Sequence, residues 1–217
     1  MMTEKFIKNE QLNFIKKQID FIKDSSKKTV PPTVLAAVID SAHAKILDLF
    51  PNASVEQQEI LNLSRLKTDD EYKQYLLLLS DFLLPFPKIN EQQLKKMFPK
   101  NKKLKLPDLS KIEHCQLTYL SWNDLGTNKK FIVYELDGKL AGIECKLTPT
   151  SKKNICSFCN GFGEVAYFST VTKAKKSKNP DYYKSIGNLI CTDSSDCNKK
   201  ITNVDYLTAF LKESLGL

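Results

Sequence analysis

Apolar side chains in the first 84 residues recur every three or four positions, which is the spacing of one face of an α-helix. Ile15, Ile19 and Ile22 define one such face. A second face follows the segment VPPT, whose prolines suit the start of a helix. The members of this second face are Leu35, Val38, Ala42, Ile46 and Leu49.

Two further helix starts carry the capping-box pattern, in which two side chains satisfy each other's backbone donors. These are Ser54-x-x-Gln57 and Thr68-x-x-Glu71. The chain contains no glycine before Gly126, which also favours helices in this part. We therefore expect four helices of about 12 to 20 residues, joined by short loops and packed as an antiparallel bundle.

The helical pattern ends at LPFPKI (84–89), where two prolines mark a domain junction. NEQQLKKMF, with Asn90 as its cap, predicts a short basic helix. Farther on, KKFIVYEL and KLAGIECKL flank Asp137-Gly138, which is a strong signal for a two-residue hairpin. EVAYFSTV and SIGNLIC predict two more strands. NVDYLTAFLKESL predicts a closing amphipathic helix with Thr202-x-x-Asp205 as its capping box.

These patterns predict an α+β protein of two domains. Residues 1–84 form an N-terminal antiparallel helical bundle, and residues 85–217 form a C-terminal mixed α/β domain with mostly antiparallel strands. A chain of 217 residues with 41% apolar and 27% charged residues has the composition of a soluble globular protein. No apolar run approaches the roughly 18 residues that cross a bilayer. The charged N-terminus lacks the features of a signal peptide, so we expect a cytoplasmic protein with no membrane partner.

The formal net charge of +8 belongs to the second domain. Residues 1–84 hold 11 Lys and Arg against 12 Asp and Glu, whereas residues 85–217 hold 22 against 13. Residues 88–105 alone contain seven lysines and one glutamate. A second cluster consists of Lys173, Lys175, Lys176 and Lys178. This charge predicts an anionic partner for the second domain.

Six cysteines fall into two groups. The larger group, Cys156, Cys159, Cys191 and Cys197, has the spacing Cys-x2-Cys, then 31 residues, then Cys-x5-Cys. A Cys-x2-Cys pair at a tight turn can bind one metal ion without strain, and Gly161 and Gly163 permit such a turn. The pattern predicts a treble-clef-like zinc finger, although a spacing of five is wider than usual. Four thiolates leave no open coordination position, so we expect one structural Zn²⁺ ion.

Other interpretations of these cysteines are weaker. A thioredoxin-like redox pair needs a βαβ context that ICSFCNGFG lacks, and disulfides need an oxidising compartment. Four unrelated buried thiols are a further alternative. Cys115 and Cys145 occupy strand-like apolar contexts and fit small core residues. His114 adjoins Cys115 in the sequence, but neighbours on a strand face opposite sides, which disfavours a catalytic pair. We therefore predict a protein that is not an enzyme.

Four stretches of the second domain together resemble a known family. They are LPFPKINEQQLKKMFPKNKKLKLP, LSWNDLGTNKKFIVYE, CSFCN and ICTDSSDCNKKIT. The resemblance is to the FusB-type fusidic acid resistance proteins, the elongation factor G-binding family. It implies a helical bundle joined to an α/β domain with a four-cysteine zinc finger. It also implies that the zinc-finger domain binds the C-terminal domains of elongation factor G. Proteins of this type promote release of that factor from the ribosome and leave the drug unmodified.

The resemblance assigns Cys156, Cys159, Cys191 and Cys197 as the zinc ligands. In the family the contact surface has an aromatic residue in the last helix, matched here by Phe210. It also has an aromatic before the first cysteine and basic and aromatic residues before the third. This chain has Ile155, Ile186 and Leu189 at those places. Tyr182, Tyr183 and Lys184, a few residues upstream, are candidate substitutes.

Two functions from different classes follow. The first is a monomeric protein that binds elongation factor G and promotes its release, giving fusidic acid resistance or ribosome clearance. The second is a lysine-rich zinc-finger protein that binds RNA or the ribosome directly, with lysines as phosphate contacts. Arg65 is the only arginine, whereas readers of bases and phosphates favour arginine, so we expect RNA contact to be secondary.

Overall fold

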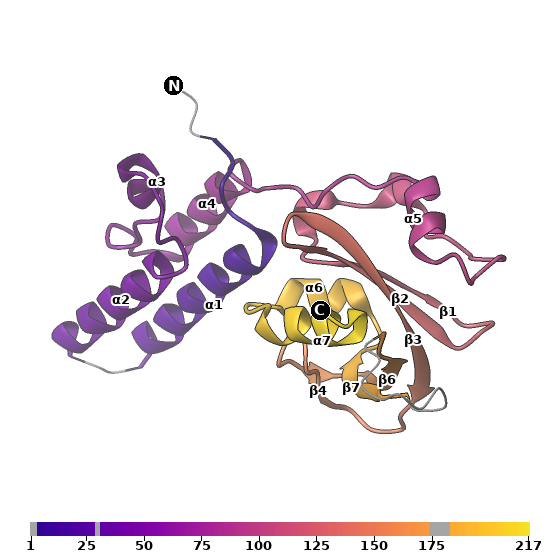
Figure 1. Cartoon of the computed structure of the whole chain (residues 1–217). Coiled ribbons are helices and arrows are strands. Elements are labelled where there is room, and N and C mark those ends of the chain that lie inside the picture. The colour runs from indigo at the N-terminus through magenta and orange to yellow at the C-terminus, as the bar shows by residue number, and fades with distance from the viewer. Residues whose placement is uncertain (1–3, 29–30, 174–182) are drawn as a thin grey trace. The chain divides into compact units, whose positions relative to one another are not determined.

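The computed structural model describes residues 4–28, 31–173 and 183–217 (Figure 1). The chain divides into two compact units, Met1–Leu84 and Pro85–Leu217. None of the described helices is long and apolar enough to cross a membrane. The predicted contact residue Tyr182 and the lysines at positions 175, 176 and 178 lie outside the described residues.

The first unit is the predicted helical bundle. Its helices are α1 (Asn9–Ser26), α2 (Pro32–Leu47), α3 (Val55–Ile60) and α4 (Asp69–Ser80). Ile15, Ile19 and Ile22 of α1 are buried, as their spacing predicts. Both predicted capping boxes form: Gln57 N donates to Ser54 Oγ at 3.3 Å, and Glu71 N donates to Thr68 Oγ1 at 3.2 Å.

The prediction of four helices with at least 12 residues is wrong for α3, which has six. The physical reason lies just after it. Leu61 and Leu63 are both fully buried, and two positions two residues apart cannot share one face of an α-helix. The chain therefore leaves the helix after Ile60 so that both leucines can enter the core.

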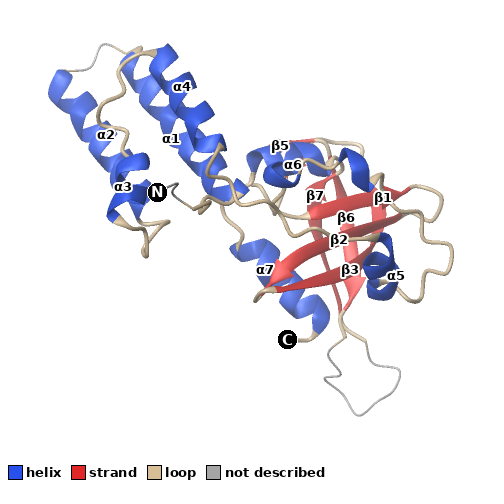
Figure 2. Ribbon diagram, turned by 90° about the horizontal axis from the view of Figure 1, so that it is seen from above, coloured by secondary structure: helices blue, strands red, loops and turns tan. Residues whose placement is uncertain are grey.

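The second unit contains a five-stranded antiparallel sheet in the order β1-β2-β3-β6-β7 (Figure 2). The strands are β1 (Leu120–Asp124), β2 (Lys129–Leu136), β3 (Lys139–Pro149), β6 (Val165–Val171) and β7 (Ser185–Cys191). Four of them match the predicted strands. The predicted hairpin joins β2 to β3, and both Asp137 and Gly138 have positive φ angles, at 49° and 77°. A two-residue hairpin turn requires these angles.

Each face of the sheet has its own apolar cluster. On one face, α5 (Glu91–Met97) and the chain beside it cover Leu120, Trp122 and Phe131. Phe98 packs so closely that a Cβ atom on Gly142 would lie 2.7 Å from its ring. On the other face, α7 (Asp205–Leu215) contributes to a cluster that also holds Phe168 and the four clustered cysteines.

Two local predictions in this unit are wrong. Cys115 was expected in a strand, but it lies in the 3-10 helix η2 (His114–Gln116), and a hydrogen bond ties the His114 ring to the Phe86 carbonyl. Thr202 does not cap α7. Instead Asn203 Oδ1 accepts the backbone N–H of Asp205 at 2.7 Å, because an amide side chain two residues earlier reaches this donor.

The buried side chain of Asn198 joins the last part of the chain to the first strand of the sheet. Asn198 lies in α6 (Ser194–Lys200). Its Oδ1 accepts the backbone N–H of Thr118 at 2.8 Å, and its Nδ2 donates to the Tyr119 carbonyl at 3.0 Å. Buried backbone groups are costly to leave unpaired, so this residue fixes α6 against the segment that leads into β1.

Candidate metal centre

The first two cysteines lie on a tight turn between two very short strands. Cys156 follows β4 (Asn154–Ile155), and Cys159 precedes β5 (Phe162–Gly163). Asn160 N donates to the Cys156 carbonyl at 2.8 Å and closes the turn. We call residues 154–163 the knuckle.

The glycines have a different role from the one predicted. The left-handed residue of the turn is Asn160, with a φ of 54°, and asparagine adopts this conformation more readily than most residues. Gly161 is instead required for space. A Cβ atom there would lie 3.3 Å from Cys159 Sγ and 3.0 Å from Cδ of Lys200.

The second pair comes from a strand end and a helix. Cys191 is the last residue of β7, and Cys197 lies in α6. Asp193 caps this helix by accepting the backbone N–H of Ser195 at 2.8 Å. The wide Cys-x5-Cys spacing follows from this arrangement, since the chain needs two residues to turn and one helical turn to bring Cys197 round.

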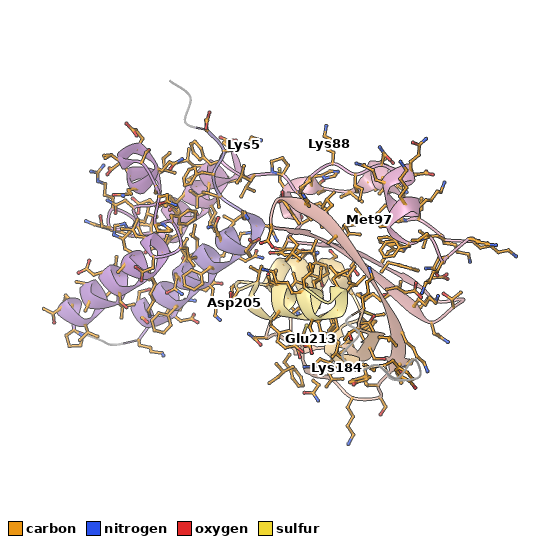
Figure 3. The ribbon with its side chains drawn as sticks, viewed as in Figure 1. Lys5, Lys88, Met97, Lys184, Asp205 and Glu213 are labelled. Atoms are coloured by element: carbon orange, nitrogen blue, oxygen red, sulfur yellow. The ribbon has the colours of Figure 1, made fainter. Side chains whose placement is uncertain are left out.

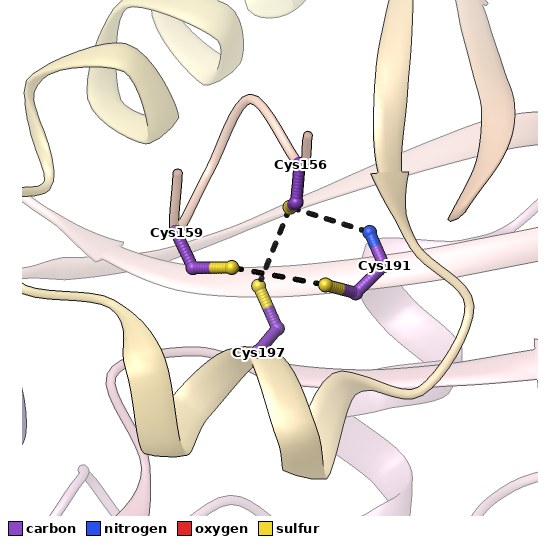
Figure 4. Close-up of side chains that lie close together, drawn as sticks. All are labelled: Cys156, Cys159, Cys191 and Cys197. Atoms are coloured by element: carbon purple, nitrogen blue, oxygen red, sulfur yellow. Dashed lines mark hydrogen bonds between the residues drawn. The ribbon is translucent and has the colours of Figure 1, made fainter. Parts of the chain in front are cut away.

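All four thiols converge on one point (Figure 4). Their sulfur atoms lie within 4.8 Å of one another, and all four residues are buried. The Sγ atoms of Cys156 and Cys197 are 3.8 Å apart, and those of Cys159 and Cys191 are 3.7 Å apart. Four sulfur ligands about 2.3 Å from a tetrahedral zinc ion lie about 3.8 Å from each other. The donor set and its spacing therefore fit zinc.

The same distances answer the alternatives for these cysteines. A disulfide needs sulfur atoms about 2.0 Å apart, and all six cysteines are free thiols. Because the four thiols belong to one cluster, they are not unrelated core residues. Such a site would use every coordination position on protein ligands, which is typical of structural and not catalytic zinc.

The buried lysine Lys130 lies beside this centre, and sequence reasoning missed it. Its Nζ donates to the Thr192 carbonyl at 3.2 Å and to Asn123 Oδ1 at 3.2 Å. Burial lowers the pKa of Lys130 to about 8, while neighbouring thiols, Cys197 first among them, favour its charged form. Four thiolates around Zn²⁺ carry a net charge of −2, which a buried cation partly offsets.

Tyr119 also lies against the centre and is fully buried. Its ring meets that of Phe158, a knuckle residue, edge to face with centroids 5.7 Å apart. Burial, reinforced by the nearby Cys197 thiol, holds the pKa of Tyr119 well above its usual value. The hydroxyl therefore stays protonated and can act as a donor next to a thiolate.

The predicted contact residues differ in exposure. Ile155 and Tyr183 are exposed, at 57% and 72%, and Leu189 and Ile186 are half-buried. Lys184 forms an ion pair with Glu213 of α7 (Figure 3). Phe210 is only 4% exposed and packs on Phe158 with ring centroids 5.8 Å apart. Its side chain therefore belongs to the core of this unit, and the structure does not offer it to a partner.

Sequence reasoning also missed two exposed aromatic residues next to the centre. Phe162 is 68% exposed and pairs directly with Ile155 across β4 and β5. Tyr206 of α7 is 40% exposed and lies against Phe158 of the knuckle, with ring centroids 6.2 Å apart. Tyr206 is thus the aromatic residue that the last helix presents to solvent. The apolar letter of Phe162 gave no signal of exposure, because Phe158 four residues earlier is buried.

We predict that Cys197→Ser lowers the zinc content of the purified protein well below about one ion per chain. The reason is that a structural zinc ion contributes on the order of 10 kcal/mol to folding. Loss of near-ultraviolet circular dichroism from the second unit should accompany the loss of metal. Cys115→Ser is the matched control, since Cys115 lies outside the cluster. Equal zinc content in both variants would contradict the assignment.

The comparisons with known proteins agree with this geometry. Residues 6–87 match the family model described as elongation factor G-binding protein, N-terminal. Residues 96–212 match the model described as FBP C-terminal treble-clef zinc-finger. A solved structure, "Structure of the fusidic acid resistance protein FusC", is 27% identical, covers 98% of this chain and 99% of its own, and has a TM-score of 0.79. No curated protein matches the chain. The two family models together span most of both units, so the chain belongs to the FusB-type family of elongation factor G-binding proteins.

Proposed function

We propose that this protein binds elongation factor G through the knuckle and its surroundings, and that it promotes release of the factor from the ribosome. The family description supports the partner, and the likeness to a fusidic acid resistance protein supports resistance as the outcome. A partner that works on the ribosome also favours a cytoplasmic site of action. The zinc ion, one per chain, would be structural.

The single observation that carries the binding surface is the exposed apolar pair on the knuckle. Ile155 and Phe162 lie directly opposite each other on strands of two residues each, and both side chains are mostly exposed. Large apolar side chains held at a rigid tip are typical anchors of protein interfaces. Leu189 lies next to the tip, because its carbonyl accepts the backbone N–H of Ser157 at 2.9 Å.

The metal centre explains why so short a hairpin can serve as an anchor. Two strands of two residues have too few hydrogen bonds to be stable alone. The zinc ligands Cys156 and Cys159 fix the turn from within, so the exposed pair is ordered before the partner arrives. Preorganisation lowers the entropic cost of binding.

Phe210 enters this proposal as a supporting residue. It is buried below Tyr206, with the two rings 6.3 Å apart and 25° from parallel, and it contacts Phe158 of the knuckle. A change at Phe210 would therefore alter binding indirectly, by moving Tyr206 and the knuckle. Tyr183 and Lys184 lie on the segment that leads into β7 and extend the candidate surface toward α7.

Release needs only differential affinity. A protein that binds elongation factor G more tightly as it leaves than when it is trapped shifts the equilibrium toward departure. A tenfold shift corresponds to about 1.4 kcal/mol of difference between the two states. No bond is made or broken in such a mechanism, which agrees with a binding protein and not an enzyme.

We predict that Phe162→Ala weakens binding to elongation factor G at least about tenfold, because truncation of a central interface anchor costs more than 1 kcal/mol. Isothermal titration against the purified factor, without ribosomes, measures the change. Leu125→Ala is the matched control, since Leu125 is 75% exposed in the same unit but away from the knuckle. The proposed surface is wrong if both variants retain zinc and bind as the unchanged protein does.

The release step has its own test. Ribosomes carrying elongation factor G that is trapped with GDP and fusidic acid should lose the factor faster when the protein is added. Phe162→Ala should slow this loss at subsaturating concentrations, because the same contacts drive it. The measurement is stopped-flow fluorescence of the labelled factor. A departure rate that does not depend on the protein would contradict the release mechanism while leaving the binding proposal intact.

A further inference from the structure

The second unit has a cavity of about 1000 Å³ that lies apart from the metal centre. One wall is the segment 96–101, which begins in α5 and includes Met97 (Figure 3). The other walls are the facing parts of β2 and β3, the end of β6 with residues 172 and 173, and Ser214. None of the lining residues belongs to the knuckle or to α6.

The cavity is strongly basic. Its lining contains five lysines and one carboxylate, that of Glu144. Glu144 is already engaged: it pairs with Lys129 at 2.5 Å and accepts a hydrogen bond from Asn101. The other lysines form no ion pair with a described residue, so they leave four uncompensated positive charges around one cavity. They are Lys96, Lys100, Lys146 and Lys173.

Two of the five lysines face each other directly. Lys129 of β2 and Lys146 of β3 are register partners, so their side chains leave the same face of the sheet. Like charges directly opposite each other on neighbouring strands are destabilising. Glu144, two residues before Lys146 on the same face, offsets the charge of Lys129 but leaves that of Lys146. This cost has no explanation in folding, whereas an anionic ligand would offset it.

A buried hydroxyl provides an independent sign of a ligand. Thr172 lines the cavity and is only 8% exposed, and its Oγ1 has no hydrogen-bond partner among the described residues. Buried polar groups are nearly always paired, so an unpaired one beside a basic cavity fits a missing acceptor such as a phosphate oxygen. Thr172 adjoins Lys173, which lets both side chains serve one anionic group.

The distribution of these groups indicates which anion fits. The lysines come from separate segments around the cavity and not from a single loop that could cradle one compact phosphate. Phe98, the aromatic residue in the lining, is 4% exposed and packs on Trp122 and Phe131, so it offers no free ring for stacking on a base. We infer that this cavity binds the phosphate backbone of RNA, without reading its bases, as a second surface separate from the knuckle.

The experiment measures binding of a fluorescein-labelled single-stranded oligo(U), about 20 nucleotides long, to the zinc-loaded full chain. Fluorescence anisotropy is followed from low to physiological salt. If four lysines each neutralise a phosphate, log Kd should change with log salt by a slope of about 3. Lys100→Gln with Lys146→Gln should lower this slope by about 2, at about one per lost contact.

The matched control is Lys88→Gln with Lys139→Gln, which removes the same charge from lysines of the same unit outside the cavity. This control should retain the full salt slope. The inference is overturned if the oligonucleotide does not bind at low salt, or if both double variants lose binding equally. It is also overturned if a poly-glutamate peptide binds the cavity more tightly than the RNA does, because the site would then take an acidic protein.

Elongation factor G separates the two surfaces. The cavity double variant should bind the factor as tightly as the unchanged chain, because no lining residue belongs to the knuckle. A parallel loss of factor binding would overturn the inference, since the cavity would then be part of the protein interface. Failure of Phe162→Ala to affect factor binding would instead count against the proposed function alone.

Discussion

The convergence of four thiols is the constraint on which the second unit depends. They bring together three segments that lie far apart in the chain: the knuckle, the end of β7 and the first turn of α6. Without a shared ion, four buried thiols would provide only weak contacts between these segments. With it, the knuckle, the sheet edge and the helix become one rigid body.

The surrounding core is arranged around this centre. Phe158 of the knuckle lies against Tyr119, Phe210 and Tyr206, so one ring connects the start of the sheet, the last helix and the metal ligands. Lys130 adds a buried positive charge beside Cys191, and Asn198 satisfies the backbone where α6 meets the chain before β1. Rigidity inside and exposed apolar groups outside are two consequences of the same site. The basic cavity lies apart from it and shares none of these residues.

Much of this could be predicted from the sequence, because the signals are local. Capping boxes, the Asp137-Gly138 turn and the cysteine spacing each depend on residues a few positions apart. What could not be predicted depends on packing. Phe158 and Phe162 look equivalent in the sequence, yet one is buried and the other exposed. Phe210 illustrates the same limit, because the family resemblance suggested a contact residue and the structure buries it below Tyr206. Strand β1 and the buried Lys130 carry no local signal of their positions.

The central claim is that the metal-held knuckle is the face that meets elongation factor G. Hydrogen exchange of the zinc-loaded protein, with and without the factor, tests it most directly because every amide of the knuckle reports. The account predicts slower exchange in residues 154–163 and in the first turn of α7 when the factor is bound. Unchanged exchange in these segments, with protection elsewhere in the chain, would contradict the claim.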